Sequence, residues 1–264
     1  HAFGATKLGL NIAIYTIIGD DDAGEAVQNK MEKAKISTNY VVVDKKHGTN
    51  MSIIIDYSGD RTIMSYHADR AYHLPEFAPT KWIYFSSIGS GHEKFNNKLN
   101  EYVKNKRIKL GFNPGSRQII LDMKVLKPIL EVTEILFVNK QEGEKLAKKT
   151  GNIKSILKSL REFGPKIVVM TDGKNGSYCY DGENFYKLGV MKLPVVESTG
   201  SGDAYASGFV AAAINNCAVE EAMRWGGANA SSVVGKVGSQ AGLLNKHQMQ
   251  ELLAEHKYFH PVLF

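Results

Sequence analysis

The sequence predicts an α/β fold in which a central, mostly parallel sheet lies between helices. From residue 81 onward, short apolar runs alternate with segments whose apolar residues recur at helical spacing. Such alternation is typical of parallel strands joined by helices that cover the sheet. The chain has 264 residues, enough for a full core, and its 43% of apolar residues is ordinary for a globular protein.

The N-terminal quarter of the chain predicts a strand, a helix start and a small lid. Residues 11–19 form an apolar run that ends in glycine and is followed by three aspartates, which suits a buried strand and the acidic first turn of a helix. Residues 40–43, 52–56 and 61–65 predict a small antiparallel sheet. These strands do not fit a parallel sheet, so we expect residues 40–66 to project as a β lid.

The rest of the chain predicts strands and helices in alternation. The predicted elements are strand 82–86, helix 93–106, strand 108–112, helix 124–130, strand 135–138 and helix 141–150. A hairpin with strands at residues 166–171 and 177–180 follows, because the Asn175-Gly176 pair is a strong turn signal. Helices at residues 204–215 and 220–234 carry the chain almost to its end.

Composition argues against several classes of function. The formal net charge of +6 comes from lysines spread along helical faces such as residues 145–149 and 154–158, without the aromatic interleaving of a nucleic-acid surface. No apolar run reaches the ~18 residues of a membrane span or is flanked like a signal peptide, so we expect a cytoplasmic protein with no membrane partner. Cys179 and Cys217 lack the spacing of a zinc or redox motif, which predicts buried, reduced thiols.

The sequence TGSGD at residues 199–203 predicts an anion-binding turn. Two glycines let the backbone approach a ligand closely, and the following helix directs its free amides and the positive end of its dipole toward that ligand. The spacing is that of neither a dinucleotide-binding GxGxxG turn nor a Walker loop. Asp203 has two interpretations: an acid stabilised at a helix start, or a base beside an anion site, which is what phosphorylation of an alcohol requires.

The sequence STGSGDAYASGF at residues 198–209 closely resembles the C-terminal signature of the ribokinase (PfkB) family of sugar and nucleoside kinases. Residues 139–142, NKQE, match the family's Asn-x-x-Glu, which is associated with magnesium and ATP phosphates, although alone they could form only a capping box. Residues 169–176 resemble the family's nucleotide-binding hairpin, which alone could be only a turn. Three such motifs in order, each at a strand end, favour the kinase interpretation.

The resemblance implies one kinase domain over residues 1–264, with a ribokinase-like three-layer fold and a β lid. It implies transfer of the γ-phosphoryl group of ATP to a hydroxyl of a sugar, with Asp203 as the general base. The amides that would form the anion hole belong to Gly200, Ser201 and Gly202. A nucleoside kinase of the same family and a catalytically silent nucleotide- or metabolite-binding relative stay as alternatives.

The resemblance also implies where cofactors bind. The residues that would hold the nucleotide are Asn139, Glu142, Thr171, Gly173, Gly176 and Asn229. Magnesium would be held by Glu142, through water. A potassium ion would lie near Glu197, Thr199 and Gly238. Because Glu197-Ser198 stands where the family usually has Asp-Thr, we expect potassium activation to be weak.

The acceptor is predicted from weaker signals. Asn113 follows a predicted parallel strand, where open sheets place ligands, so it either contacts substrate or only turns the chain. Lid residues such as Tyr57, Arg61 and His67 include few apolar groups that could stack on a base, so we expect a sugar. We also expect a homodimer through the β lid. The family's Gly-Gly substrate loop, first sheet strand and substrate-binding aspartate would lie upstream of His1.

Overall fold

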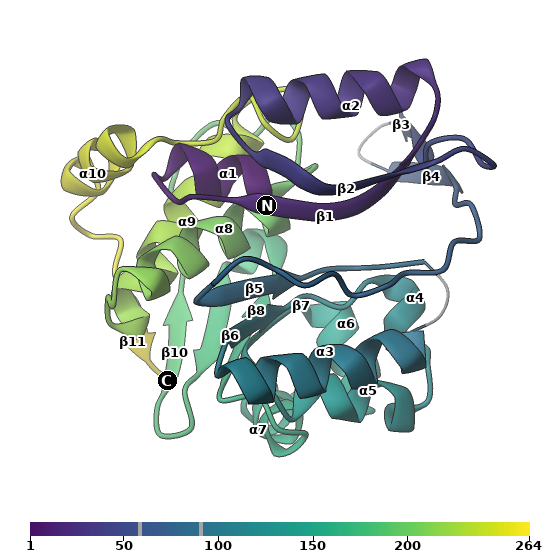
Figure 1. Ribbon diagram of the computed structural model, residues 1–264. Helices are drawn as coiled ribbons and strands as arrows, with labels where there is room; N and C mark the ends of the chain where they lie inside the picture. Colours follow the sequence, from purple (N-terminus) through teal and green to yellow (C-terminus); the bar gives the residue numbers. More distant parts are fainter. Residues whose placement is uncertain (58–59, 90–91) are drawn as a thin grey trace.

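A computed structural model describes residues 1–57, 60–89 and 92–264 of the chain (Figure 1). Its largest sheet has seven strands in the order β11-β10-β9-β8-β7-β6-β5. These strands are β5 (Trp82–Phe85), β6 (Lys109–Phe112), β7 (Thr133–Asn139), β8 (Ile167–Thr171), β9 (Ser177–Tyr180), β10 (Phe185–Leu188) and β11 (Val262–Leu263). Strands β5 to β8 run parallel, and the pairs from β8 to β11 are antiparallel. The predicted parallel region and the predicted hairpin, β8 and β9, are therefore confirmed.

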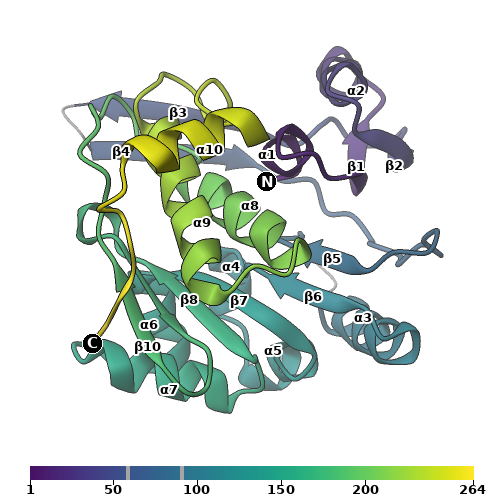
Figure 2. The ribbon, with the colours of Figure 1, turned by 90° about the vertical axis from the view of Figure 1, so that its left-hand side faces the viewer.

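Helices cover both faces of this sheet, so the molecule has three layers (Figure 2). The helices on one face are α1 (Ala2–Lys7), α8 (Ser201–Ile214), α9 (Val219–Val234) and α10 (Lys246–Glu255). Those on the other face are α3 (His92–Lys106), α4 (Ser116–Ile119), α5 (Met123–Leu130), α6 (Lys140–Ala147) and α7 (Ile153–Glu162). Among the described residues, no helix is long and apolar enough to cross a membrane.

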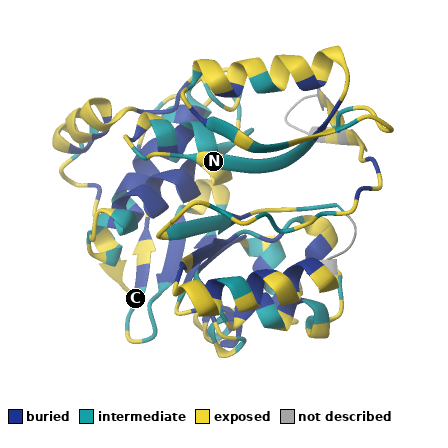
Figure 3. Ribbon diagram, viewed as in Figure 1, coloured by how far each residue is buried: buried dark blue, intermediate teal, exposed yellow. Residues whose placement is uncertain are grey.

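Strand β7 shows why the sheet needs cover on both faces. Ile135 and Phe137 belong to the core beneath α8 and α9, whereas Leu136 and Val138 belong to the core beneath α5 and α7. Successive side chains of a strand point to opposite faces, so the continuous apolar run at residues 135–138 must be buried on both faces. Figure 3 shows the buried residues concentrated in these strands and in α8, while the outer helix α2 (Asp22–Lys33) is mostly exposed.

Strands β1 (Ala13–Gly19) and β2 (Ser37–Asp44) form a separate two-stranded parallel sheet. The prediction that residues 40–43 join an antiparallel lid sheet is therefore wrong: Tyr40 pairs with Tyr15 and Val42 with Ile17, parallel to β1. The physical reason is the 12-residue helix α2 between the strands, since a helical crossover returns the chain in the direction of the first strand.

The lid is a hairpin of β3 (Met51–Tyr57) and β4 (Asp60–Tyr66), so it begins at residue 51 rather than at residue 40. Among the described residues it pairs with no other strand, and it lies at the upper right in Figure 1 and at the upper left in Figure 2. Its exposed apolar side chains alternate along the strands and so share one face: Met51, Ile53, Ile55, Met64 and Tyr66. Of the residues used to predict a sugar, His67 is exposed, and the side chains of Tyr57 and Arg61 lie outside the described residues.

Several elements differ from the predicted ones. Helix α8 begins at Ser201, three residues before the predicted start, so Asp203 lies inside its first turn. Helices α1, α4 and α10 and strands β10 and β11 go beyond the elements that the sequence predicts. Helix α4 has four residues and β11 has two, which is too short for a periodic pattern to be recognised.

The two-sided core gives a stability prediction. Leu136→Ala should lower the free energy of unfolding by about 2–5 kcal/mol, because Leu136 is 0% exposed in the centre of the sheet and its loss leaves a cavity. The matched control is Ile120→Ala, whose side chain is 78% exposed and whose loss should cost less than about 0.5 kcal/mol. Urea unfolding of both variants measures the difference, and equal losses would contradict the assigned core.

Candidate active site

The parallel strands bring several predicted site residues to one edge of the sheet. Asn139 ends β7, Thr171 ends β8, and the two residues are paired across the strands. Asn113 follows β6, and its side-chain amide Nδ2 donates a hydrogen bond of 2.8 Å to the carbonyl oxygen of Phe137 on β7. The carboxyl ends of parallel strands meet at the same edge, which is where open α/β sheets bind ligands.

Asn139 and Glu142 form a reciprocal capping box at the start of α6. The backbone N–H of Asn139 donates to Glu142 Oε2 at 2.8 Å, and the backbone N–H of Glu142 donates to Asn139 Oδ1 at 2.9 Å. The capping alternative is therefore realised, and it holds the Glu142 carboxylate at this edge of the sheet. Burial raises the pKa of Glu142 more than these hydrogen bonds lower it.

The hairpin between β8 and β9 presents an exposed turn beside α6. Residues Gly173–Asn175 form one turn of 3₁₀ helix, and Lys140 at the start of α6 lies 3.6 Å from the Asp172 carboxylate. Gly176 has φ +88° and its Cβ would lie 2.0 Å from the carbonyl oxygen of Leu188, so only glycine fits there. The space beside Gly173 is open within 4 Å, which leaves room for a ligand at the turn.

The TGSGD segment forms the N-terminal turn of α8. Gly200 is the N-cap with φ +81°, and a Cβ on it would lie 2.4 Å from Ser239 Cβ. The Ser201 amide donates to the carbonyl oxygen of Ser198, whereas the amides of Gly202 and Asp203 have no backbone acceptor among the described residues. Both residues are exposed, and the space beside Gly202 is open within 4 Å. The turn therefore offers two amide donors and the positive helix end to solvent.

Asp203 and Glu142 come from different layers but approach the same buried hydroxyl. The Tyr84 hydroxyl on β5 is buried, and its pKa is raised first by burial and then by the carboxylates of Asp203 and Glu142. The Asp203 side chain itself is 59% exposed. The carboxylates of Asp203 and Glu142 are therefore both near enough to Tyr84 to raise the pKa of its hydroxyl. Sequence reasoning did not single out Tyr84, because a tyrosine inside an apolar strand gives no signal other than packing.

Two loops meet next to the start of α8. Glu197 Oε2 accepts a hydrogen bond of 2.9 Å from the backbone N–H of Gly238, and the amides of Val196 and Glu197 donate to the carbonyl oxygen of Val234. The residues predicted to surround a potassium ion are thus brought together in part, since Glu197 and Gly238 are in contact. Among the described residues, no group of three or more His, Cys, Asp or Glu side chains could hold a metal ion.

Asn229 lies behind the active-site turn. It is 0% exposed, and its Nδ2 donates to the carbonyl oxygen of Ala204 at 2.9 Å and to Ser207 Oγ at 3.1 Å. Its Oδ1 accepts from the Leu244 amide at 3.0 Å. The side chain predicted to bind the nucleotide is therefore used to join α8, α9 and the loop before α10.

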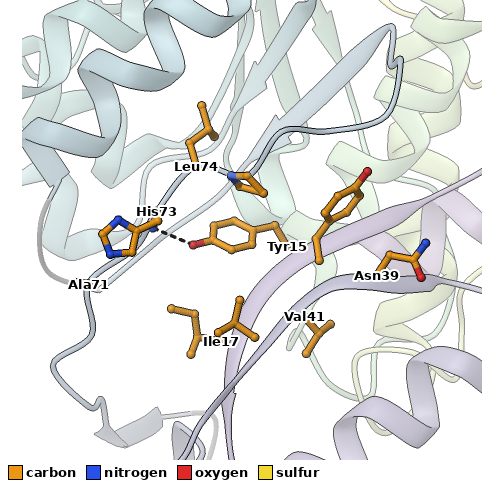
Figure 4. A pocket seen from close by; sticks show the side chains of 10 residues that line it. Tyr15, Ile17, Asn39, Val41, Ala71, His73 and Leu74 are labelled. Atoms are coloured by element: carbon orange, nitrogen blue, oxygen red, sulfur yellow. Dashed lines mark hydrogen bonds between the residues drawn. The ribbon is translucent and has the colours of Figure 1, made fainter.

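An apolar pocket of about 330 Å³ lies away from these residues, between the β1–β2 sheet and residues 71–75 (Figure 4). The Tyr15 hydroxyl reaches across it and accepts a hydrogen bond of 3.0 Å from the backbone N–H of His73. None of the residues that the sequence predicts for a site line this pocket.

Comparison with known proteins gives consistent matches. A family model described as pfkB family carbohydrate kinase matches residues 1–246. A nucleoside kinase of Methanothermobacter thermautotrophicus is 24% identical over 90% of this chain and 77% of its own length. A cytidine kinase of Thermococcus kodakarensis is 29% identical over 90% of this chain and 86% of its own length. A 5-dehydro-2-deoxygluconokinase of Halalkalibacterium halodurans is 27% identical over 95% of this chain and 82% of its own length.

Solved structures confirm the predicted ribokinase-like fold. The nucleoside kinase of Methanocaldococcus jannaschii, an archaeal member of the ribokinase family, superposes with a TM-score of 0.79 and 23% identity. It aligns over 97% of this chain and 84% of that chain. Ribokinase from Thermotoga maritima gives a TM-score of 0.79 at 18% identity, over 96% of this chain and 85% of its own.

The geometry at Gly200 gives a second prediction. Gly200 has φ +81°, and Gly151, the control, has φ +86°. Substitution of either glycine by alanine places a Cβ at a positive φ, so each variant should lose about 1 kcal/mol or more of unfolding free energy. Only Gly200→Ala forces a contact with Ser239, which should cost a further ~1–3 kcal/mol. Denaturant unfolding compares the two variants. Equal losses would show that the turn does not need this close approach.

Proposed function

Because the chain belongs to the pfkB family of carbohydrate kinases, we propose that it transfers the γ-phosphoryl group of ATP to a hydroxyl of a sugar. The observation that carries this proposal is the start of α8, where the exposed Asp203 carboxylate adjoins two amides that face solvent. Transfer of a phosphoryl group needs a base for the attacking hydroxyl and donors for the charge that develops on the transferred group.

In the proposed mechanism, Asp203 accepts the proton of the acceptor hydroxyl as the hydroxyl oxygen attacks the γ-phosphorus. The bond between the γ-phosphorus and the oxygen that bridges it to the β-phosphate breaks, and ADP leaves with that oxygen. The amides of Gly202 and Asp203, with the positive end of α8, stabilise the negative charge on the transferred group. Of the three amides predicted as donors, that of Gly202 keeps this role, and Gly200 supplies the turn that exposes it. The Ser201 amide is engaged by the carbonyl oxygen of Ser198, and the Asp203 amide, which was not predicted, takes its place. We infer that Asn229 acts indirectly, since its hydrogen bond to the Ala204 carbonyl oxygen holds the first turn in place.

The nucleotide would lie along the strand ends. The turn from Thr171 to Gly176, which is exposed at residues 173–175, and the capping residue Asn139 would hold it. Glu142 fits a magnesium ion through a water, because Oε2 is engaged by the Asn139 amide and the second oxygen remains for the metal's hydration shell. Magnesium would neutralise charge on the phosphate oxygens.

The acceptor would contact Asn113, whose Nδ2 is engaged by Phe137 and whose Oδ1 remains as an acceptor for a hydroxyl. A nucleoside is the second candidate acceptor, because two of the similar proteins are a nucleoside kinase and a cytidine kinase. Turnover of ATP by the full-length protein against a panel of hexoses, pentoses and nucleosides tests the choice. Faster turnover of any nucleoside than of every sugar would contradict the proposal that the acceptor is a sugar. The absence of turnover with every acceptor would contradict the proposed kinase activity.

Asp203→Asn is the mutation that tests the base. The amide keeps the shape of the side chain but cannot accept the proton, so turnover should fall by ~10²–10⁴-fold while ATP affinity changes little. The matched control is Asp22→Asn, because Asp22 is also an exposed acid in the first turn of a helix, α2. A variant at Asp203 that retains more than about a tenth of the wild-type rate would return this residue to the role of a helix-start acid.

Potassium should activate the enzyme weakly. We propose that the Glu197 carboxylate, by accepting the hydrogen bond from Gly238, already joins the two loops that an ion near Thr199 would otherwise join. Glu197→Asp shortens the side chain by one methylene, so it should break this contact and make turnover depend more strongly on potassium. Identical rates of both proteins in potassium, sodium and a bulky organic cation would show that no such site is used.

The exposed apolar face of the lid hairpin is proposed to pair with a second copy of the chain. Its members Ile53 and Met64 are each 52% exposed and lie opposite one another on β3 and β4. Ile53→Lys should convert a dimer to a monomer in sedimentation velocity, whereas Ile120→Lys, at a 78% exposed position outside the lid, should not. A wild-type protein that stays monomeric at high concentration would contradict this interface.

A further inference from the structure

We propose that Arg70 is a positioning residue that fixes the base of the lid hairpin and thereby sets the affinity for the acceptor. The first half of this inference is independent of the reaction. The second half rests on the proposed function, since it requires the lid to act on a kinase acceptor.

The Arg70 side chain is 2% exposed and binds chain segments on both sides of the lid. Its nitrogens donate to Asp44 Oδ2 at 2.9 Å, Ile17 O at 3.1 Å, Asn50 Oδ1 at 3.3 Å, His47 O at 3.1 Å and Gly48 O at 2.6 Å. These acceptors belong to the end of β1, the end of β2 and the loop that leads into β3. A buried guanidinium whose three nitrogens all donate holds the groups around it in one arrangement.

A second anchor holds the same loop from the opposite side. The Thr49 amide donates to Asp21 Oδ2 at 2.8 Å, and the Thr49 hydroxyl donates to Asp21 Oδ1 at 2.6 Å. The same hydroxyl accepts from the Gly19 amide at 2.9 Å. Because Asp21 is also the N-cap of α2, the loop into the lid is fixed to the β1–α2 junction as well as to Arg70.

Both legs of the hairpin meet at this cluster. Asn50 immediately precedes β3, and Arg70 follows the last residue of β4, Tyr66, by four positions. Asn50 Oδ1 joins the legs directly, because it accepts from Arg70 and also from the Ala68 amide at 2.9 Å. Beyond Arg70 the chain crosses β1, where Tyr15 accepts from the His73 amide, as Figure 4 shows.

The orientation of the lid therefore depends on its base. The hairpin pairs with no other strand among the described residues, so no ladder of hydrogen bonds holds it to the main sheet. Its seven-residue strands span about 20 Å, so a rotation of about 5° at the base moves the tip by about 2 Å. A shift of that size is enough to displace a lid from the groups of a bound acceptor.

The chemistry of arginine explains why lysine cannot replace it. Lysine keeps the positive charge beside Asp44. Its single ammonium nitrogen cannot, however, reach all five acceptors that the three nitrogens of the planar guanidinium bind. Arg70→Lys should therefore loosen the base of the lid. Asn50→Ala removes the side-chain oxygen that joins the two legs of the hairpin. It keeps the buried ion pair of Arg70 with Asp44, so this variant should fold more readily than Arg70→Lys.

The experiment measures amide hydrogen exchange and steady-state kinetics on the full-length protein. The variants are Arg70→Lys and Asn50→Ala, with Arg161→Lys as control, since Arg161 binds Lys166 and Tyr180 far along the chain from the lid. In each lid variant, exchange in β3 and β4 should quicken by about fivefold, the factor that corresponds to one net hydrogen bond. The KM of the acceptor should rise by a similar factor, while kcat and the KM of ATP stay within about twofold.

The outcomes separate this inference from the proposed function. Wild-type exchange of the lid in both variants overturns the role of Arg70, whatever the activity of the protein. Faster exchange with an unchanged KM of the acceptor overturns the link to the acceptor. Equal rises in the KM of ATP and of the acceptor also overturn that link, because they indicate a general loss of structure. A wild-type protein without kinase turnover contradicts the proposed function, and the exchange data then still decide whether Arg70 fixes the lid.

Discussion

The N-terminal turn of α8 depends on one backbone conformation, the positive φ of Gly200, and on the contact of this residue with Ser239. Because Gly200 has no Cβ, the turn packs directly on the loop that follows α9, and α8 begins at Ser201 with its dipole directed to solvent. The amides of Gly202 and Asp203 and the Asp203 carboxylate belong to this turn, and the Glu197 carboxylate holds the loop at Gly238. A buried support reinforces the turn, since Asn229 holds the carbonyl oxygen of Ala204 from behind.

The central sheet supplies the other half of the proposed site. Strands β6 to β8 run parallel between two cores, so their carboxyl ends form one edge of the sheet. Two carboxylates from different layers, Glu142 at the start of α6 and Asp203 at the start of α8, both raise the pKa of the buried Tyr84 hydroxyl. The lid hairpin pairs with no other strand in the part of the chain that the structure describes, and Arg70, Asp21 and their partners bind the chain at its base. In the proposed kinase, this edge of the sheet and the lid would together hold the two substrates and exclude water.

Local patterns predicted the parts of the fold that depend on local chemistry. The alternating elements after residue 81, the β8–β9 hairpin and the glycine turn before α8 follow from periodicity and from turn residues. The pairing of β2 with β1 was missed, because it depends on the direction in which α2 returns the chain. Arg70 was also missed, because the sequence alone predicts an exposed side chain for an arginine in this position. Its burial depends on Ile17, Asp44 and Asn50, which only the folded chain places around it. Asn229 was found as a motif residue, yet its hydrogen bonds are with the protein interior, which no spacing could indicate.

The central claim is that the acceptor hydroxyl and the transferred phosphoryl group meet at the start of α8. The most direct measurement is a crystal structure of the full-length protein with ADP, magnesium, aluminium fluoride and the acceptor that turns over fastest. The account predicts fluoride atoms at about 3 Å from the amide nitrogens of Gly202 and Asp203, with the acceptor hydroxyl hydrogen-bonded to the Asp203 carboxylate. An aluminium fluoride group bound elsewhere, or one whose attacking hydroxyl is held by a base other than Asp203, would contradict it.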